Sequence, residues 1–449
     1  MTAEPALQSL PPSANGPTTP SLHLERFAAL KTRLPGRDVP WLARAREDAA
    51  ERFAALGFPT MKDEAWHYTN LASLAKAALA PKPEAPGTPA ELPRIVGDGA
   101  RLVFVGGRYR PDLSDRARLP RDVMITPLGE AMDRNPELIE SHLRQGASED
   151  SLPALNTAFM TDGVVIRIPR GTRLEAPIHV VVLGAAGQAV HLRILVTAEA
   201  ASAATIIEHY LGRGAEPSWT NVVTQLAIEE RAALRHVKIQ DETEATFHTA
   251  KLEAAVAAGA SFDSFVLTKG GRLARHEIAA ALNGEGAGCR LYGVTLARAH
   301  QHIDNTTVID HKAPGCTSDE LYRAVLDGEA RAVFQGRIVV RKDAQKTNAH
   351  QLNENLLLSE RASVDTKPEL EIHADDVKCG HGATAGALDE QGLFYLRARG
   401  IGRERAMGML IEAFVSDLVE RAEGEDVRAL LSAAVGGWLP GTALSGAAA

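Results

Sequence analysis

The sequence predicts a mainly β protein whose two ends are helical. Short β-favouring runs follow one another about every 12 to 15 residues between Gly163 and Arg341, and no helix-length pattern interrupts them. Helical periodicity is confined to the segments on either side of this region. A dozen or more strands without intervening helices exceed an ordinary sandwich. The pattern therefore favours a β-solenoid, although no crisp sequence repeat recurs.

The composition excludes several classes of protein. The chain has 449 residues, of which 45% are hydrophobic and 24% charged, as in a globular protein of two or three units. The net charge of −8, without a block of Lys or Arg, argues against a nucleic-acid binder. No apolar run approaches the roughly 18–20 residues of a membrane span. Three isolated cysteines cannot form a disulfide framework, so we expect a cytoplasmic protein that binds neither membrane nor nucleic acid.

The N-terminal part is expected to be a short tail followed by helices. The first 20 residues contain five prolines among small polar residues, which predicts a disordered tail over 1–20. Apolar residues then recur at helical spacing, first at 22–34 and again at 41–56, and Pro35-Gly36 separates the two runs. These patterns predict an N-terminal helical domain over 21–95.

A connecting region is expected between this domain and the strands. It spans 96–160 and follows a Pro-rich stretch at 80–93. Within it, RLVFVGGRYRPDLS at 101–114 is typical of a short hairpin.

The solenoid core is predicted over 161–400. It ends with GLFYLRARGI at 392–401, which resembles a strand. The other predicted strands are 164–169, 178–184, 190–196, 204–210, 222–228, 233–239, 246–254, 261–270, 272–282, 289–297, 306–311 and 331–342.

Helical periodicity returns in a C-terminal helical domain at 401–449. Residues 403–422 carry an apolar stripe, and residues 425–439 form a second amphipathic segment. The stripe consists of Ala406, Met409, Leu410, Ala413, Phe414 and Leu418. Such a helical pair either caps the β body or presents its stripe to a partner.

The common enzyme motifs sought in the chain are absent. There is no GxxxxGK[ST], GxSxG or HExxH, and the glycine cluster at 284–288 precedes no predicted helix. A polysaccharide-processing enzyme on a β-helix stays open as an alternative. However, the paired acids Asp375 and Asp376 are adjacent and would point apart in a strand, which does not suit an acid–base pair.

One cluster, IHADDVKCGHGAT at 372–384, has the residue types of a metal site. Cys379 and His381 are two residues apart, so their side chains share one face of an extended segment. A thiolate and an imidazole suit iron, zinc or a cluster with sulfide ligands. The alternative is a buried cysteine beside a turn histidine, neither with a role. Two donors do not complete a four-coordinate site, so a real site needs further ligands, and another subunit could supply them.

Long stretches of the chain resemble one known family. PTMKDEAWHYTNL at 59–71 is similar to its N-terminal segment, and LNTAFMTDGVVIRIPRG at 155–171 is similar to the entry to its core. Residues 300–384, which include the cysteine–histidine cluster, resemble its most specific block. The family is that of the SufB/SufD iron–sulfur cluster assembly proteins, and the resemblance is greatest to its SufD branch.

The resemblance implies a right-handed parallel β-helix flanked by helical domains, acting as a non-enzymatic scaffold. It also implies two partners: SufB, bound through the core, and SufC, an ABC-type ATPase that binds ATP and docks on the C-terminal helices. A transient iron–sulfur cluster would form at the SufB–SufD interface. By the same resemblance His381 is the cluster-site histidine and Cys379 its neighbour, while Met409, Leu410 and Phe414 are candidates for SufC docking.

Two alternatives stay open within this resemblance. A SufB-type paralogue shares the core but is usually longer and has more cysteines in its N-terminal region. The first 288 residues here contain none, which favours the SufD type. The chain could also form a homodimer when it is alone.

Overall fold

The computed structural model describes residues 19–82, 99–117, 119–145, 150–212 and 214–439. Most of the predicted disordered tail, and most of the Pro-rich stretch, lie outside these residues. Thr19 and Pro20 already belong to the first helix, because proline is tolerated in a first helical turn. None of the helices within the described ranges is both long and apolar enough to cross a membrane.

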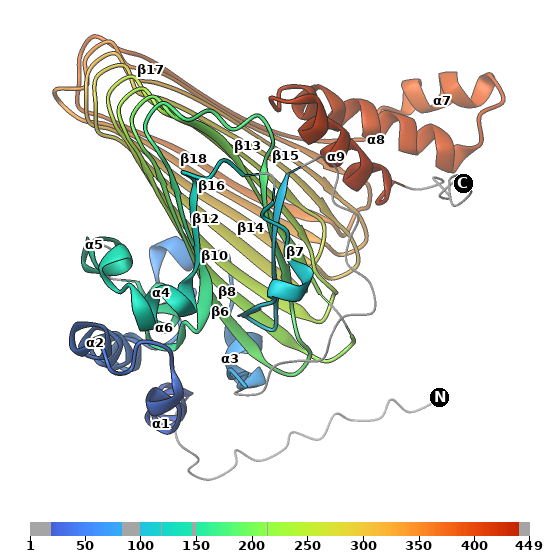
Figure 1. The fold of residues 1–449 in the computed structure, drawn as a ribbon. Helices are drawn as coiled ribbons and strands as arrows, with labels where there is room; N and C mark the ends of the chain where they lie inside the picture. Colours follow the sequence, from blue (N-terminus) through green and yellow to red (C-terminus); the bar gives the residue numbers. More distant parts are fainter. Residues whose placement is uncertain (1–18, 83–98, 118, 146–149, 213, 440–449) are drawn as a thin grey trace, which may run out of the picture.

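Two parallel sheets face each other and form the predicted solenoid (Figure 1). The chain alternates between them, so that consecutive strands from β4 to β19 fall in different sheets. The ten-stranded sheet contains, from its last strand to its first, β19 (Lys378–Ala387), β17 (Asn348–Leu357), β15 (Thr317–Leu326), β13 (Gly288–Ala297), β11 (Ser261–Thr268), β9 (Ala233–Asp241), β7 (Ala203–Leu211), β5 (Ile178–Leu183), β1 (Ala100–Val105) and β2 (Arg108–Tyr109).

The nine-stranded sheet follows the same order. It contains β18 (Ser363–Ile372), β16 (Arg331–Val340), β14 (His302–His311), β12 (Leu273–Leu282), β10 (Thr246–Val256), β8 (Ser218–Ile228), β6 (Ala189–Ala198), β4 (Asp162–Ile168) and β3 (Met124–Pro127). Between β4 and β19, partners in neighbouring turns are 26 to 32 residues apart, as for Phe247 with Leu273 and Arg331 with Ser363. Each turn therefore stacks on the next without a fixed sequence period.

The predicted strands are confirmed, but the end of the core differs from the prediction. All twelve runs overlap strands, and the predicted hairpin is the antiparallel pair β1–β2, although β1 also extends the ten-stranded sheet beside β5. Residues 392–401 are not a strand: most of them form helix α7 (Glu390–Ala398). The carboxylate of Asp389 caps this helix by accepting from the Gln391 backbone N–H, and Leu393 is buried.

The N-terminal helices cover the outer face of the nine-stranded sheet. Phe53 and Phe159 pack there with Trp219 and Phe247 of the sheet. The helices are α1 (Thr19–Leu30), α2 (Pro40–Leu56), α3 (Ala72–Ala77), α4 (Leu128–Arg134), α5 (Glu137–Gln145) and α6 (Ser151–Phe159), with 3-10 turns at Lys31–Arg33 and Glu64–Trp66. A further 3-10 turn, Pro111–Leu113, lies beside β1 of the ten-stranded sheet. The region expected only to connect therefore supplies three helices to this cover.

The C-terminal helices cover the opposite side. α8 (Arg403–Glu420) and α9 (Glu425–Gly436) pack on the outer face of the ten-stranded sheet, where Ile411 and Val415 contact a cluster that includes Phe265 and Val294 (Figure 1). Only Ala406 and Leu418 of the predicted stripe are buried, and the face of α8 that packs on the sheet consists mainly of Ile411, Val415, Leu418 and Val419. The prediction was therefore wrong about which side chains of this helix cap the β body.

A short segment fastens the N-terminal helices to the late turns of the solenoid. We call residues 64–69 the strap; it lies between α2 and α3. It contacts four successive strands of the nine-stranded sheet. The Arg275 guanidinium of β12 lies over Trp66, and Thr69 hydrogen-bonds to His302 and Asp304 of β14. The Ala65 carbonyl accepts from Gln335 of β16, and Glu64 pairs with Lys367 of β18. The strap is part of the motif-like segment at 59–71, so the structure gives that segment a packing role.

Candidate functional site

Cys379 and His381 lie on β19, the last strand of the ten-stranded sheet. Cys379 packs partly against the core between the two sheets, and His381, two residues later, shares this inner face. Gly380 and Gly382 lie on the outer face, where a Cβ added to Gly382 would come within 3.1 Å of Leu352 Cδ1. The structure therefore confirms that the two predicted residues are close together and share a face, at the open end of the solenoid.

The two side chains differ in exposure. His381 is exposed, whereas Cys379 is half-buried. Burial raises the pKa of the Cys379 thiol above its ordinary value, although the Ala349 backbone N–H opposes the shift. The thiol is therefore mostly protonated at neutral pH in the lone chain, and a metal ion would have to displace this proton.

Two residues near this pair, Asp376 and His373, are engaged elsewhere. Asp376 pairs with Lys346, and His373 Nε2 lies 2.9 Å from Glu371 Oε1. Within the described ranges no three histidine, cysteine or acidic side chains are arranged to hold a metal ion. Within the described residues, Cys379 and His381 therefore have no third side chain of these types beside them.

Behind the pair, the interior of the last turns is polar, which the sequence analysis did not anticipate. Glu320 is 1% exposed, and its Oε2 accepts a hydrogen bond of 2.7 Å from Gln351 Nε2. Burial raises the pKa of Glu320 to about 7. Further along the same strand as Gln351, Asn355 Nδ2 donates to Asn353 Oδ1 at 2.7 Å.

A second polar cluster lies deeper in the solenoid, also unforeseen. It consists of Glu208, Tyr210, His236, Lys238, Glu242 and His248, all buried. His236 Nε2 lies 3.2 Å from Glu208 Oε1, and His248 Nδ1 lies 2.7 Å from Glu242 Oε2. Burial alone would raise the pKa of Glu208, but its hydrogen bond with His236 and the nearby Lys238 charge outweigh burial and hold it at about 2. Tyr210 and His248 hydrogen-bond to Glu208 and Glu242 respectively, so the two buried carboxylates have polar partners, which explains how they are tolerated in the core.

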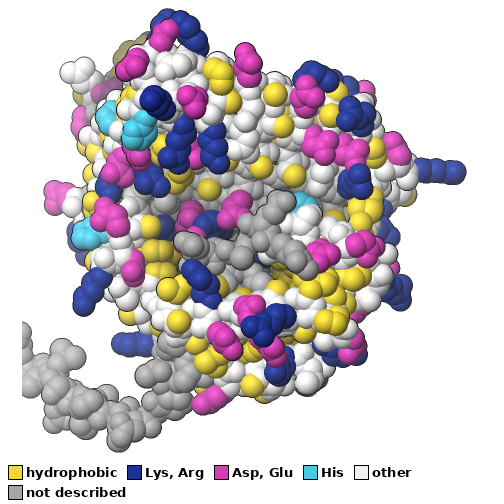
Figure 2. All heavy atoms as spheres, turned by 90° about the vertical axis from the view of Figure 1, so that its left-hand side faces the viewer, with side chains coloured by type: hydrophobic (Ala, Val, Ile, Leu, Met, Phe, Trp, Pro, Cys, Tyr) yellow, Lys and Arg dark blue, Asp and Glu magenta, His cyan; other side chains and the backbone are white. Residues whose placement is uncertain are grey.

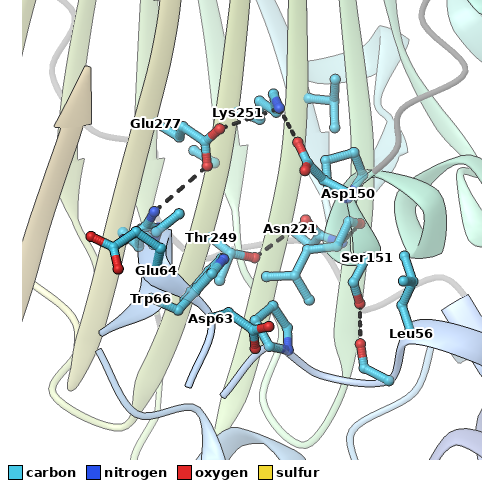
Figure 3. Close-up of a pocket in the computed structure, with 18 residues that line it drawn as sticks. Leu56, Asp63, Glu64, Trp66, Asp150, Ser151, Asn221, Thr249, Lys251 and Glu277 are labelled. Carbon is cyan, nitrogen blue, oxygen red and sulfur yellow. Dashed lines mark hydrogen bonds and ion pairs between the residues drawn. The ribbon is translucent and has the colours of Figure 1, made fainter. Parts of the chain in front are cut away.

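A cavity of about 360 Å³ lies between the N-terminal segment and the outer face of β8, β10 and β12 (Figure 3). Trp66 and Leu56 line one side of it, and Lys251 lies at the other, paired with Asp150 and, at 3.2 Å, with Glu277. Burial alone would lower the pKa of Lys251, but the two carboxylates hold it above its ordinary value. The cation is thus already neutralised within the protein.

The surface on the side of α2 and α5 shows no electrostatic preference. Lys and Arg side chains are intermixed with Asp and Glu over this face (Figure 2). A nucleic-acid binder would gather positive charge on a face, so this side of the molecule does not have that character.

The three predicted docking residues on α8 differ in position. Met409 is 40% exposed and Leu410 is half-buried, whereas Phe414 is half-buried against the helix–sheet core under the guanidinium of Arg323. The neighbouring α7 adds Phe394, which is 75% exposed. Sequence reasoning missed Phe394 because it placed that segment in a strand.

Comparison with known proteins identifies the family of this chain. Residues 181–414 match the model of the SUF system FeS cluster assembly SufBD core domain, and residues 21–82 and 92–180 match that of the SufBD protein N-terminal region. Together these matches cover most of the chain. The chain belongs to the SufB/SufD family and has a role in iron–sulfur cluster assembly.

Individual relatives agree with this assignment. The chain is 33% identical to the iron–sulfur cluster assembly protein SufD of Escherichia coli over 86% of this chain and 90% of the relative. It is 32% identical to an iron–sulfur cluster assembly SufBD family protein of Synechocystis, over 88% and 91% respectively. The SufD protein of Bacillus subtilis is 25% identical, over 87% and 92%. These alignments extend over nearly the whole of each protein, so the similarity is not limited to a single motif.

Proposed function

We propose that this chain is a SufD-type scaffold subunit that supports iron–sulfur cluster assembly without catalysing a reaction itself. The observation that carries the proposal is the position of Cys379 and His381 on the inner face of the terminal strand β19. The names of the relatives in Escherichia coli and Bacillus subtilis support the SufD type over the SufB type. The absence of the enzyme motifs sought in the full sequence is consistent with a scaffold.

The partner at this end would be SufB. β19 and β18 are the last strands of their sheets, so their outer edges offer backbone N–H and C=O groups to another chain. Glycines and alanines fill most of β19, and their small side chains allow a second backbone to approach closely. A SufB solenoid placed against these edges would face His381 and Cys379 and supply the missing ligands. The nascent cluster is the cargo of this interface.

The ATPase SufC would dock on the C-terminal helices. The exposed apolar side chains Met409 of α8 and Phe394 of α7 mark this surface, and Leu410 of α8 is half-buried. Phe414 supports this surface from below, since it packs against the core. ATP would be bound by SufC.

The cluster site is tested by His381→Ala in the complex co-expressed with SufB and SufC. We expect the complex to assemble, because an exposed side chain at the edge buries little core area, while bound iron and acid-labile sulfide fall sharply. Cys379→Ala should have a milder effect. His373→Ala is the matched control, since His373 is exposed and lies eight residues earlier. Wild-type iron and sulfide in His381→Ala would refute the ligand role, and loss of the complex would assign His381 to the interface.

The docking surface is tested by Met409→Asp and Phe394→Asp. Each places a charge on an exposed apolar position, so we expect SufC to be lost from the purified complex while SufB is retained. Ser432→Asp adds the same charge at an exposed position of α9 and serves as the control. Full retention of SufC by both variants would contradict docking at this surface.

A further inference from the structure

One row of interior side chains leads from the core of the solenoid to His381. Strands β13, β15, β17 and β19 are parallel and in register, so Leu291, Glu320, Gln351 and His381 are successive partners. Equivalent side chains on such strands stack about 4.8 Å apart. Gln351 therefore lies directly behind His381, and Glu320 lies directly behind Gln351.

The Gln351 amide has a fixed orientation and an unused acceptor. Its Nε2 donates to Glu320 Oε2 at 2.7 Å, so the carbonyl end of the amide points away from Glu320. Gln351 is 2% exposed, yet its Oε1 has no hydrogen-bond partner in the described part of the chain. A buried carbonyl without a donor costs about 1–3 kcal/mol, which indicates that a donor reaches it in the working state.

The facing sheet leaves space for this amide. A Cβ on Gly336 of β16 would lie 2.1 Å from Gln351 Nε2, so any larger residue at this position would push the amide aside. The glycine keeps Gln351 in the row beneath His381 and lets it bond to Glu320.

We propose that Gln351 is a positioning residue for His381. When the site is closed by a partner, one imidazole N–H of His381 donates to Gln351 Oε1, and the other ring nitrogen presents its lone pair to the iron. Histidine ligands ordinarily donate their second N–H to a carbonyl or carboxylate, which fixes the tautomer and the ring orientation. Glu320 anchors the row by holding the Gln351 amide. This inference rests on the proposed ligand role of His381.

The test measures binding of Fe²⁺ alone to the co-purified complex of this chain with SufB and SufC. Gln351→Leu removes the amide at similar volume, and we expect a 10- to 100-fold loss of Fe²⁺ affinity, as for other partners of metal ligands. Asn353→Leu is the matched control. It removes a buried amide from the same face of β17, but Asn353 lies behind Ala383 and not behind His381. It should lower the thermal midpoint comparably without the loss of affinity. Gln351→Met replaces Gln351→Leu if the latter does not assemble.

A double variant separates positioning from general damage. In the His381→Ala background, Gln351→Leu should cause no further loss of Fe²⁺ affinity, because the residue acts through His381. Wild-type affinity in Gln351→Leu, together with lost affinity in His381→Ala, would overturn the positioning role alone. Wild-type affinity in His381→Ala would overturn the proposed function itself.

Discussion

Replacing Glu320 with Gln tests whether this buried side chain is protonated in the folded protein, through the pH dependence of stability. Burial raises the pKa of Glu320 from 4.5 to about 7, so the folded chain binds this proton more tightly than the unfolded chain. The resulting stabilisation is fully present below pH 4.5 and is lost as pH rises towards 7. This difference in pKa between the folded and unfolded chain corresponds to roughly 3 kcal/mol. Between pH 5 and pH 8, roughly 2 to 3 kcal/mol of it should disappear.

The assay compares urea unfolding of the wild type and Glu320→Gln at several pH values. The variant has no proton to lose at this position, so it does not lose this stabilisation as the pH rises. The free energy of unfolding of the variant minus that of the wild type should therefore increase by roughly 2 to 3 kcal/mol between pH 5 and pH 8. The buried histidines titrate alike in both proteins and cancel in the difference. Parallel curves across this range would refute the reasoning and show that Glu320 is ionised in the folded chain at pH 5.

Three further predictions concern other parts of the molecule. Lys238→Met should destabilise the chain by about 3–5 kcal/mol in thermal unfolding, because it leaves Glu208 with one cation fewer inside the solenoid; an unchanged midpoint would contradict this. Trp66→Ala should cost roughly 3 kcal/mol and speed proteolytic cleavage between the N-terminal helices and the solenoid, since the ring lies 4.0 Å from the Arg275 guanidinium; an unchanged cleavage rate would show that the strap does not hold them. A thiol reagent should titrate one cysteine per native chain, Cys379, because the other two are buried; two fast thiols would be inconsistent with the structure.

Most strands whose two faces are buried were predicted from the sequence, but β15, in which Ser318 and Glu320 face the interior, was missed. The strands β17, β18 and β19 at the open end were missed as well. The twelve recognised runs are rich in Val, Ile and Leu. The missed strand β17, NAHQLNENLL, places Gln351, Asn353 and Asn355 inside, so it lacks an apolar alternation. β18 and β19 are largely exposed on both faces, which removes the hydrophobic signal altogether.

The candidate site could be predicted only where it is local. Cys379 and His381 are two residues apart, so their shared face follows from strand geometry. Gln351 and Glu320 are each about one solenoid turn away in sequence from the next residue of the row. Because the turns vary from 26 to 32 residues in length, the sequence has no fixed period from which the pairing of residues in neighbouring turns could be inferred. Periodicity also predicted an apolar stripe on α8, but it did not show that Ile411 and Val415, and not Met409, face the sheet.

The strap has a consequence for the order of folding. Most contacts of the solenoid join residues about 30 apart in a chain of 449, a relative separation of about 0.07, which is in the range of fast-folding helical proteins. The strap breaks this pattern, because Thr69 and Asp304 are 235 residues apart and Glu64 and Lys367 are 303 apart. During synthesis, residues 64–69 leave the ribosome long before β14 and β18 exist. Residues 64–69 therefore cannot complete their contacts until the late turns of the solenoid have folded. Docking of the strap is accordingly a late step in the folding of this chain.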